Sequence, residues 1–223
     1  MYDRDIYFGT VRDSLFDGEL TQQQVDGQSV ILAVWEYQAV SGVSVDDQRW
    51  LAYMLATVFH ECATRMWPIT EYGSETYLQG KDYWPYIGRG FVMLTWEENY
   101  RHASEELGLI DDRDLVDHPE LALDSLIATR ILFRGMTEGW FTGHKLADYF
   151  NDLIDDPINA RQIVNANDDD ELIAGYHHKF MDALTAAKFG VPDPEETPVV
   201  FVNVQAPPNV EVMVHINGVE YGT

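Results

Sequence analysis

The sequence predicts a mainly α-helical domain of about 190 residues that is followed by a short β extension. Apolar residues recur at three- and four-residue spacing in several separate stretches, and helix-capping patterns precede several of them. Alternating apolar residues appear only after Gly190. The chain has 223 residues, of which 46% are hydrophobic, so it can form one sizeable core with a small appendage.

Periodicity and capping patterns predict two helices between residues 21 and 61. Thr21-Gln-Gln-Gln24 has the form of a capping box, and apolar residues at helical spacing follow it until Gly42 interrupts the pattern. Ser44-Val-Asp-Asp47 can cap the second helix, whose apolar stripe runs from Leu51 to Phe59. This second helix therefore carries the polar pair His60 and Glu61 at its C-terminal end.

The middle of the chain is predicted to be an irregular segment followed by two helical stretches. Residues 67–90 contain prolines, glycines and many aromatic residues without a helical period, which indicates an irregular segment with room for a short hairpin. Thr95-Trp-Glu-Glu98 then has the form of a capping box for a helix that ends at Gly108. Pro119 opens a further helical run with an apolar stripe over residues 126–132.

The last helical elements precede a change in composition. Asp156-Pro157 predicts a short helix to Val164, and Asp168 to Asp170 stand where a cap and first-turn acids of a final helix belong. Residues 190–198 read as a linker because they combine prolines with acidic residues. We therefore divide the chain into a domain of residues 1–189, this linker, and a β-hairpin-like extension of residues 199–223 with a turn at Asn217-Gly218.

Charge and composition exclude several classes of function. Lys and Arg number 14 against 38 Asp and Glu, a formal net charge of −24, which argues against nucleic-acid binding and against an anionic membrane surface. No apolar run approaches the ~18 residues of a membrane span, so no membrane insertion is expected. The start, Met1 to Tyr7, lacks the pattern of a signal peptide. A single cysteine, Cys62, leaves no internal disulfide.

Carboxylates are the remaining candidates for chemistry. His60-Glu61 does not continue into a zinc-protease motif, because Thr64 stands where the second histidine is needed, and no other metal spacing is apparent. We therefore expect neither a metal nor a cofactor. Hydrolysis of a glycosidic bond needs one protonated acid and one ionised base or nucleophile. Glu61, at the end of an apolar helix, and Glu71, in the aromatic segment, are such a pair, although 38 acidic residues guarantee many chance pairs.

Ordered motifs carry a resemblance to a known family. The blocks are Phe59-His-Glu-Cys-Ala-Thr-Arg65, Pro68-Ile-Thr-Glu-Tyr-Gly73, Tyr86-Ile-Gly-Arg-Gly-Phe-Val-Met-Leu-Thr-Trp96 with Asn99-Tyr100, Pro119-Glu-Leu-Ala-Leu-Asp124, Gly139-Trp-Phe-Thr-Gly143 and Asn159-Ala-Arg-Gln-Ile-Val-Asn165. Together they resemble glycoside hydrolase family 19 over about residues 5 to 188, and the bacteriophage endolysins of that family more than its plant chitinases. The resemblance implies a lysozyme-like fold with two helical lobes.

The resemblance also implies roles for individual residues. Glu61 matches the general acid, Glu71 the base, with Glu75 as a rival, and Thr95 the residue that holds the attacking water. The candidate substrate-binding residues are His60, Tyr72, Arg89, Met93, Trp96, Asn99 and Asn165. Met93 differs from the family, which usually has Gln at this position. Arg89 can alternatively have a structural role, as a hydrogen-bond or ion-pair donor. The implied mechanism is inverting, with carboxyl groups about 6.5–9.5 Å apart.

The expected substrate is the glycan strand of peptidoglycan, cleaved at β-1,4 bonds between amino sugars. Chitin is the alternative substrate, and a virion structural or assembly protein that retains the fold is the alternative from another class. Residues 199–223 are the candidate contact with other phage virion proteins. The expected location is the host cytoplasm followed by the periplasm or cell wall, or the phage virion.

Overall fold

A computed structural model describes residues 1–37, 46–165, 168–188, 214–216 and 219–221. The chain divides into two compact units, Met1–Lys188 and Phe189–Thr223, which are described separately. The predicted break at Gly42, the linker at 190–198 and the turn at Asn217-Gly218 lie outside the described residues.

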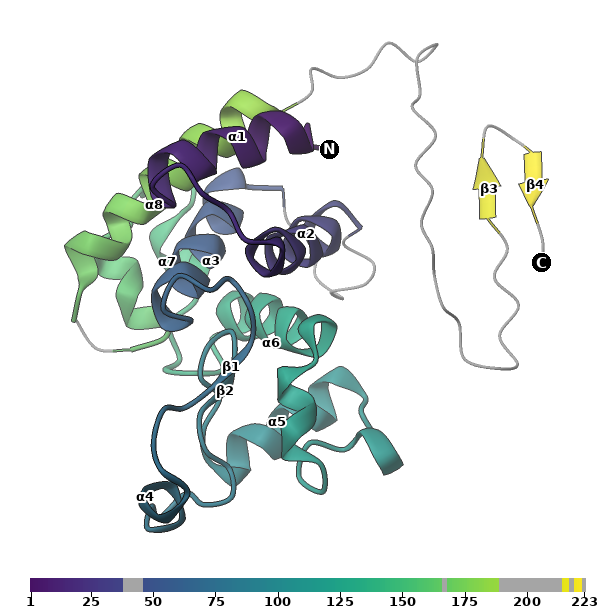
Figure 1. Cartoon of the computed structure of the whole chain (residues 1–223), viewed down its shortest axis with the longest axis vertical. Helices are drawn as coiled ribbons and strands as arrows, with labels where there is room; N and C mark the ends of the chain where they lie inside the picture. The colour runs from purple at the N-terminus through teal and green to yellow at the C-terminus, as the bar shows by residue number, and fades with distance from the viewer. Residues whose placement is uncertain (38–45, 166–167, 189–213, 217–218, 222–223) are drawn as a thin grey trace. The chain divides into compact units, whose positions relative to one another are not determined.

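Three long helices form one part of the first unit. Helix α1 (Arg4–Leu15) and helix α8 (Asp170–Ala187) lie side by side, and α8 also packs along α3 (Gln48–Glu61) (Figure 1). The backbone joins the two ends of the unit, because the Asp3 amide donates to the Ala187 carbonyl over 2.8 Å. Residues 51–59 of α3 are all buried, so α3 is the axis of the core.

Helix α2 (Gln22–Glu36) confirms the first predicted capping box. The Thr21 side chain accepts from the Gln24 amide, and the Gln24 side chain accepts from the Thr21 amide. The helix ends at Glu36, before the predicted break. It packs against α6 (Ser125–Glu138), and Gly27 lies against the chain just after α3, where an added Cβ would be 1.7 Å from the Met66 carbonyl oxygen.

The smaller lobe combines a two-stranded sheet with short helices. Strand β1 (Ile69–Thr70) pairs antiparallel with β2 (Arg89–Gly90), with Ile69 opposite Gly90 and Thr70 opposite Arg89. The segment 67–90 thus contains an antiparallel strand pair, but residues 71–88 separate the strands, so the connection is longer than that of the short hairpin expected there. Helix α4 (Glu75–Gln79), which the sequence analysis missed, lies between the two strands along the chain, and Ser74 caps it through a side chain that accepts from the Tyr77 amide.

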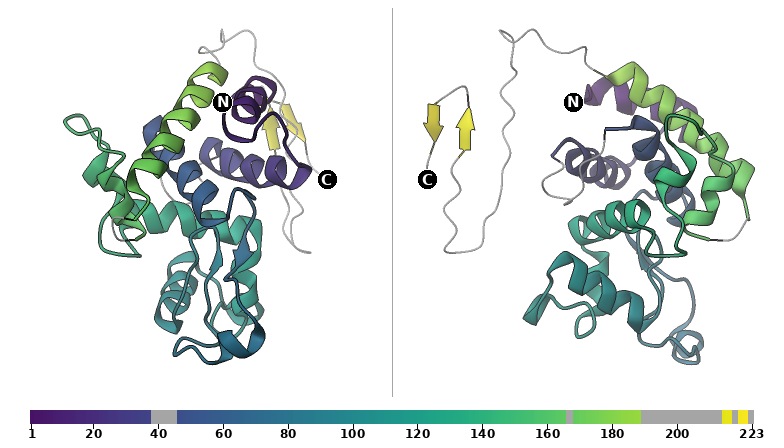
Figure 2. Two further views of the ribbon diagram at one scale, coloured as in Figure 1. Left: turned by 60° about the vertical axis from the view of Figure 1, so that its left-hand side comes forward. Right: turned by 180° about the vertical axis from the view of Figure 1, so that it is seen from behind.

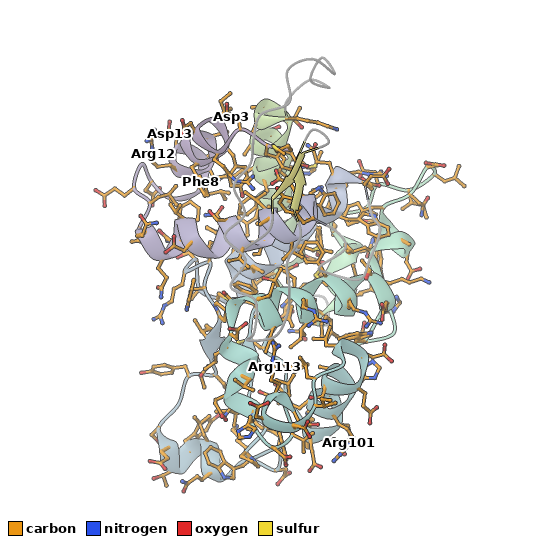
Figure 3. All side chains as sticks on the ribbon, turned by 90° about the vertical axis from the view of Figure 1, so that its right-hand side faces the viewer. Asp3, Phe8, Arg12, Asp13, Arg101 and Arg113 are labelled. Carbon is orange, nitrogen blue, oxygen red and sulfur yellow. The ribbon has the colours of Figure 1, made fainter. Side chains whose placement is uncertain are left out.

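Helix α6 lies between this lobe and the helices of the larger one, in both Figure 1 and Figure 2. Helix α5 (Glu97–Leu107) packs on α6, and Figure 3 places Arg101 of α5 and Arg113 of the 3₁₀ helix η2 (Asp111–Arg113) far from Asp3 at the start of α1. The remaining described elements are η3 (Pro119–Leu123), α7 (Leu146–Tyr149) and η4 (Asn159–Ile163).

Two predicted helices differ in type from expectation. The run that opens at Pro119 is first a 3₁₀ helix, and the α-helix begins only at Ser125, because the Asp124 carboxylate caps it by accepting from the Leu126 and Ile127 amides. The element predicted from Asp156 to Val164 is likewise 3₁₀ and covers Asn159–Ile163.

Two predicted caps are wrong. Helix α5 starts after Trp96, at φ 77°, without a side-chain cap, because Thr95 lies one residue before the N-cap position, where its hydroxyl donates to the Met93 carbonyl. Helix α8 starts after Asp169 without a side-chain cap, because Asp168 binds Arg161 and Asp169 faces His60. In both places the polar side chain has another partner.

The second unit contains a described strand pair. Strand β3 (Val214–Ile216) pairs antiparallel with β4 (Val219–Tyr221), with Val214 opposite Tyr221. With the helical first unit, this pair confirms the predicted mainly α fold with a short C-terminal β extension. Among the described residues, no helix combines the length and apolarity needed to cross a membrane.

Candidate active site

Helix α3 places Glu61 at its C-terminal end. The buried stripe stops at Phe59, and His60 and Glu61 then reach partly exposed positions. The chain turns sharply there, with positive φ values at Ala63, Thr64 and Met66, and the Gln24 side chain of α2 donates to the Thr64 carbonyl. Because α2 and α3 both fix this turn, the position of Glu61 is set by the core.

The Glu61 carboxylate has an arginine partner that the sequence analysis missed. Arg161 Nη1 lies 2.6 Å from Glu61 Oε1, and the two side chains are only 3% and 16% exposed. Arg161 also donates through Nε to the Asp168 backbone carbonyl over 3.1 Å, and its Nη2 lies 3.3 Å from Asp168 Oδ1. The guanidinium is therefore shared between two carboxylates, and it links η4 to the end of α3.

Two other predicted residues lie beside this ion pair. His60 Nε2 is 3.6 Å from Asp169 Oδ2. The Asn165 amide donates to the Arg161 carbonyl, and its side-chain Nδ2 is 3.5 Å from Asp168 Oδ2. Asp168 and Asp169, just before α8, thus contact Arg161, Asn165 and His60, which lie on either side of the Glu61 ion pair.

Glu71, directly after β1, is held at three points. Its backbone amide donates to the Gly88 carbonyl over 2.7 Å, and its Oε2 accepts from the Gly88 amide over 3.1 Å. Its Oε1 accepts from the Tyr83 hydroxyl over 2.8 Å. Glu75, the rival, lies in the first turn of α4, is exposed, and accepts from the Gln79 side chain.

Gly88 is the point where Glu71, Met93 and Thr95 meet. A Cβ at Gly88 would lie 3.1 Å from Met93 Cε and 3.4 Å from both Glu71 Cβ and Thr95 Oγ1. Thr95 Oγ1 donates to the Met93 carbonyl over 2.8 Å, and the Asn99 side chain donates to the Thr95 carbonyl over 2.7 Å. The predicted residues 71, 93, 95 and 99 therefore form one cluster.

Arg89 makes the hydrogen bonds expected of a structural residue, which was the alternative to a role in substrate binding. Its Nη1 donates to the Pro85 carbonyl over 3.0 Å and to the Tyr100 hydroxyl over 3.1 Å, and Tyr100 in turn donates to the Ile87 carbonyl. Tyr72 is 99% exposed, and Trp96 is also exposed, so both rings are open to a ligand.

The strand pair connects the two halves of the site. Cys62, next to Glu61, is buried, and its thiol lies 3.7 Å from the Gly90 carbonyl of β2. Burial, with the Glu61 charge second, raises the pKa of Cys62 to about 12, so this thiol is not a nucleophile at neutral pH. Within the described part of the chain, no group of three or more His, Cys, Asp or Glu side chains is arranged to hold a metal ion.

The order and packing of these elements identify the fold of the first unit. It is the lysozyme-like helical fold of family 19 chitinases. Chitinase C from Streptomyces griseus HUT6037 is similar over 82% of this chain and 76% of its own, with 18% identity and a TM-score of 0.56. A bacterial family 19 chitinase is similar over 82% of this chain and 94% of its own, with 18% identity and a TM-score of 0.50. No protein-family model and no curated protein matches the chain. The likeness confirms the predicted two-lobed fold class.

Proposed function

We propose that this chain is a glycoside hydrolase that cleaves β-1,4 bonds between amino sugars with inversion of configuration. The observation that carries the proposal is the pair of anchored glutamates, one at the end of α3 and one directly after β1, within the fold of family 19 chitinases. Glu61 is anchored by Arg161, and Glu71 is anchored by Gly88 and Tyr83. Both side chains belong to the first unit.

Glu61 is the proposed general acid, which protonates the leaving oxygen. Its ion pair with Arg161 orients the carboxyl group. A general acid must carry a proton, however, and a protonated carboxyl group no longer forms an ion pair with Arg161. Asp168 offers the guanidinium a second carboxylate at 3.3 Å, so Arg161 keeps an acidic partner when Glu61 takes up a proton. The three side chains thus form a unit that can hold Glu61 in place in both protonation states.

Glu71 is the proposed base, and Thr95 is its proposed partner in holding the attacking water. The Thr95 hydroxyl uses its one proton on the Met93 carbonyl, so its oxygen is an acceptor toward a water molecule. One water hydrogen can then point to Thr95 and the other to Glu71. Glu75, in the first turn of α4, instead accepts from the Gln79 side chain of the same helix, which supports Glu71 over Glu75.

The geometry of an inverting pair gives a direct structural expectation. The carboxyl groups of Glu61 and Glu71 are expected about 6.5–9.5 Å apart with substrate bound, which leaves room for one water. A crystal structure with a bound amino-sugar oligomer measures this separation. A separation near 5 Å, typical of retaining enzymes, contradicts the proposed mechanism.

Substitution of the two glutamates tests the proposal directly. Glu61→Gln keeps the side-chain shape but removes the acid, and we expect loss of nearly all hydrolysis while the far-UV circular dichroism is retained. Glu71→Gln is expected to do the same, and Glu75→Gln is the matched control that retains activity. Full activity of Glu61→Gln removes Glu61 from the acid role, and loss of activity only in Glu75→Gln moves the base to that position.

The proposed substrate is peptidoglycan, which the phage-like motif blocks favour over chitin. The chitinase names of the similar structures favour chitin as the second candidate. Purified peptidoglycan and chitin oligomers are each incubated with the chain. Mass spectrometry of the fragments then reports the bond cleaved, and proton NMR reports the first anomer formed. Cleavage of chitin alone replaces the peptidoglycan assignment.

We also propose that the second unit attaches the enzyme to a phage particle. Its separate strand pair supports this role, and the negative charge of the chain gives no attraction to an anionic cell wall. Deletion of residues 190–223 is expected to abolish particle incorporation and to leave hydrolysis intact. Unchanged incorporation after the deletion refutes this role of the second unit, whereas absence of the full-length chain from purified particles supports a freely released lysin, which acts from the host cytoplasm on the wall.

A further inference from the structure

Both oxygens of the Glu71 carboxylate accept a hydrogen bond from a separate donor. The Gly88 amide donates to Oε2, and this donor belongs to the backbone next to β2. The Tyr83 hydroxyl donates to Oε1 over 2.8 Å, and Tyr83 is a side chain to which neither the motifs nor the fold comparison gave a role. An ionised carboxylate has about four acceptor positions, so each oxygen keeps one for another donor.

Tyr83 is itself held by the segment that carries Thr95. The Tyr83 carbonyl accepts from the Tyr86 amide over 2.7 Å, and the Tyr86 carbonyl accepts from the Trp96 amide over 2.9 Å. The rings of Tyr83 and Trp96 meet edge to face with centroids 5.3 Å apart. The phenol is therefore fixed relative to the residue that is proposed to hold the water.

We propose that Tyr83 is a positioning residue, which orients Glu71 so that one defined lone pair of the carboxylate receives the proton from the attacking water. The inference rests on the proposed function of Glu71 as the base. With Gly88 it prevents rotation of the carboxylate about its last bond, and misplacement of a reacting group by about 1 Å can cost 10²-fold in rate. The hydrogen bond to Glu71 is the largest cause that raises the pKa of Tyr83 above its ordinary value, so the phenol remains a donor at neutral pH.

The kinetic test compares two tyrosines of the same lobe. Tyr83→Phe removes the hydroxyl and keeps the ring against Trp96, whereas Tyr77→Phe removes the hydroxyl of an exposed tyrosine on α4. On the polysaccharide that the wild type cleaves, we expect Tyr83→Phe to lower kcat about tenfold to hundredfold with KM nearly unchanged. Tyr77→Phe is expected to match the wild type in both parameters.

A second variant separates the hydrogen bond from the aromatic packing. Tyr83→His keeps a ring N–H that can donate, and its kcat is expected between those of the wild type and Tyr83→Phe. Equal kcat values for the wild type and Tyr83→Phe overturn the inference. A rise in KM with unchanged kcat also overturns it, since that result assigns Tyr83 to substrate binding instead.

A titration tests the contact without any measurement of activity. Tyrosine labelled with ¹³C at Cζ is titrated by NMR in the wild type and in Glu71→Gln, and the Tyr83 signal is assigned by its loss in Tyr83→Phe. The pKa of Tyr83 is expected to fall in Glu71→Gln, because the ionised acceptor is gone. An unchanged value overturns the inference.

The two sets of results keep the two proposals distinguishable. If Glu71→Gln retains hydrolysis, the proposed function of Glu71 fails, and the positioning role fails with it even where the titration shows the contact. If Glu71→Gln is inactive while Tyr83→Phe keeps the wild-type kcat, the function of Glu71 stands and only the role of Tyr83 is lost.

Discussion

The ion pair between Glu61 and Arg161 should be measurable as a coupling free energy. Arg161→Met removes the guanidinium but keeps an apolar stem, and it leaves the Glu61 carboxylate largely buried without its cation. Loss of one partner of a buried pair costs about 3–5 kcal/mol. Because Glu61 is 16% exposed and can still reach water, we expect a loss of about 3 kcal/mol, at the low end of this range.

A double-mutant cycle gives the coupling itself. Glu61→Gln is expected to cost about 1–2 kcal/mol, because its amide oxygen can still accept and Arg161 keeps Asp168. The double variant is expected to lose about 1–2 kcal/mol less than the sum of the two single losses. Urea unfolding at pH 7 provides the free energies, and Arg12→Met, at an exposed pair with Asp13, is the control that leaves stability unchanged. Additive losses within about 0.5 kcal/mol refute a coupled pair.

Two further predictions concern the stability of the first unit. Burial, with the neighbouring His178 second, lowers the pKa of His177 to about 3. Below about pH 6.5, His177 is therefore protonated in the unfolded state but stays neutral in the folded state. The free energy of unfolding should fall by up to about 1.4 kcal/mol per pH unit between about pH 6.5 and about pH 3. Urea unfolding at pH 7 and pH 4.5 measures this loss, which should be smaller in His177→Phe; equal losses contradict it. Gly27→Ala should cost about 3 kcal/mol or more, because its Cβ would overlap the Met66 carbonyl. Gly9→Ala in α1, whose Cβ meets nothing within 4 Å, should instead add about 0.5–1 kcal/mol, and thermal unfolding compares the two.

Local patterns predicted the helices well where one face of the helix is buried. The stripe from Leu51 to Phe59 is wholly buried in α3, and the capping box at Thr21 forms as expected, because both depend on residues within a few positions of each other. The short helix α4 was not predicted, because five residues are too few to show a helical period.

The caps at Thr95 and Asp168 to Asp170 show where local reasoning fails. The Thr95 hydroxyl serves the loop before α5, whereas Asp168 and Asp169 contact Arg161 and His60. Asp170 lies in the first turn of α8, as predicted. A capping hydrogen bond contributes about 1 kcal/mol, so another good partner can replace it. Both failures fall in the candidate active site, where polar side chains have other uses.

The amino-acid sequence alone indicated a helical domain with a β extension, and its motifs singled out Glu61, Glu71 and Thr95. The helices follow from spacing along the chain, whereas the three residues follow from the resemblance of the ordered motifs to glycoside hydrolase family 19. The partners of the two glutamates came only from the tertiary structure. Arg161 lies 100 residues after Glu61 and Tyr83 lies 12 after Glu71, and each pair is joined by the packing of different elements. A hydrogen bond requires a donor and an acceptor within about 3 Å, and for residues so far apart along the chain only the fold determines that distance.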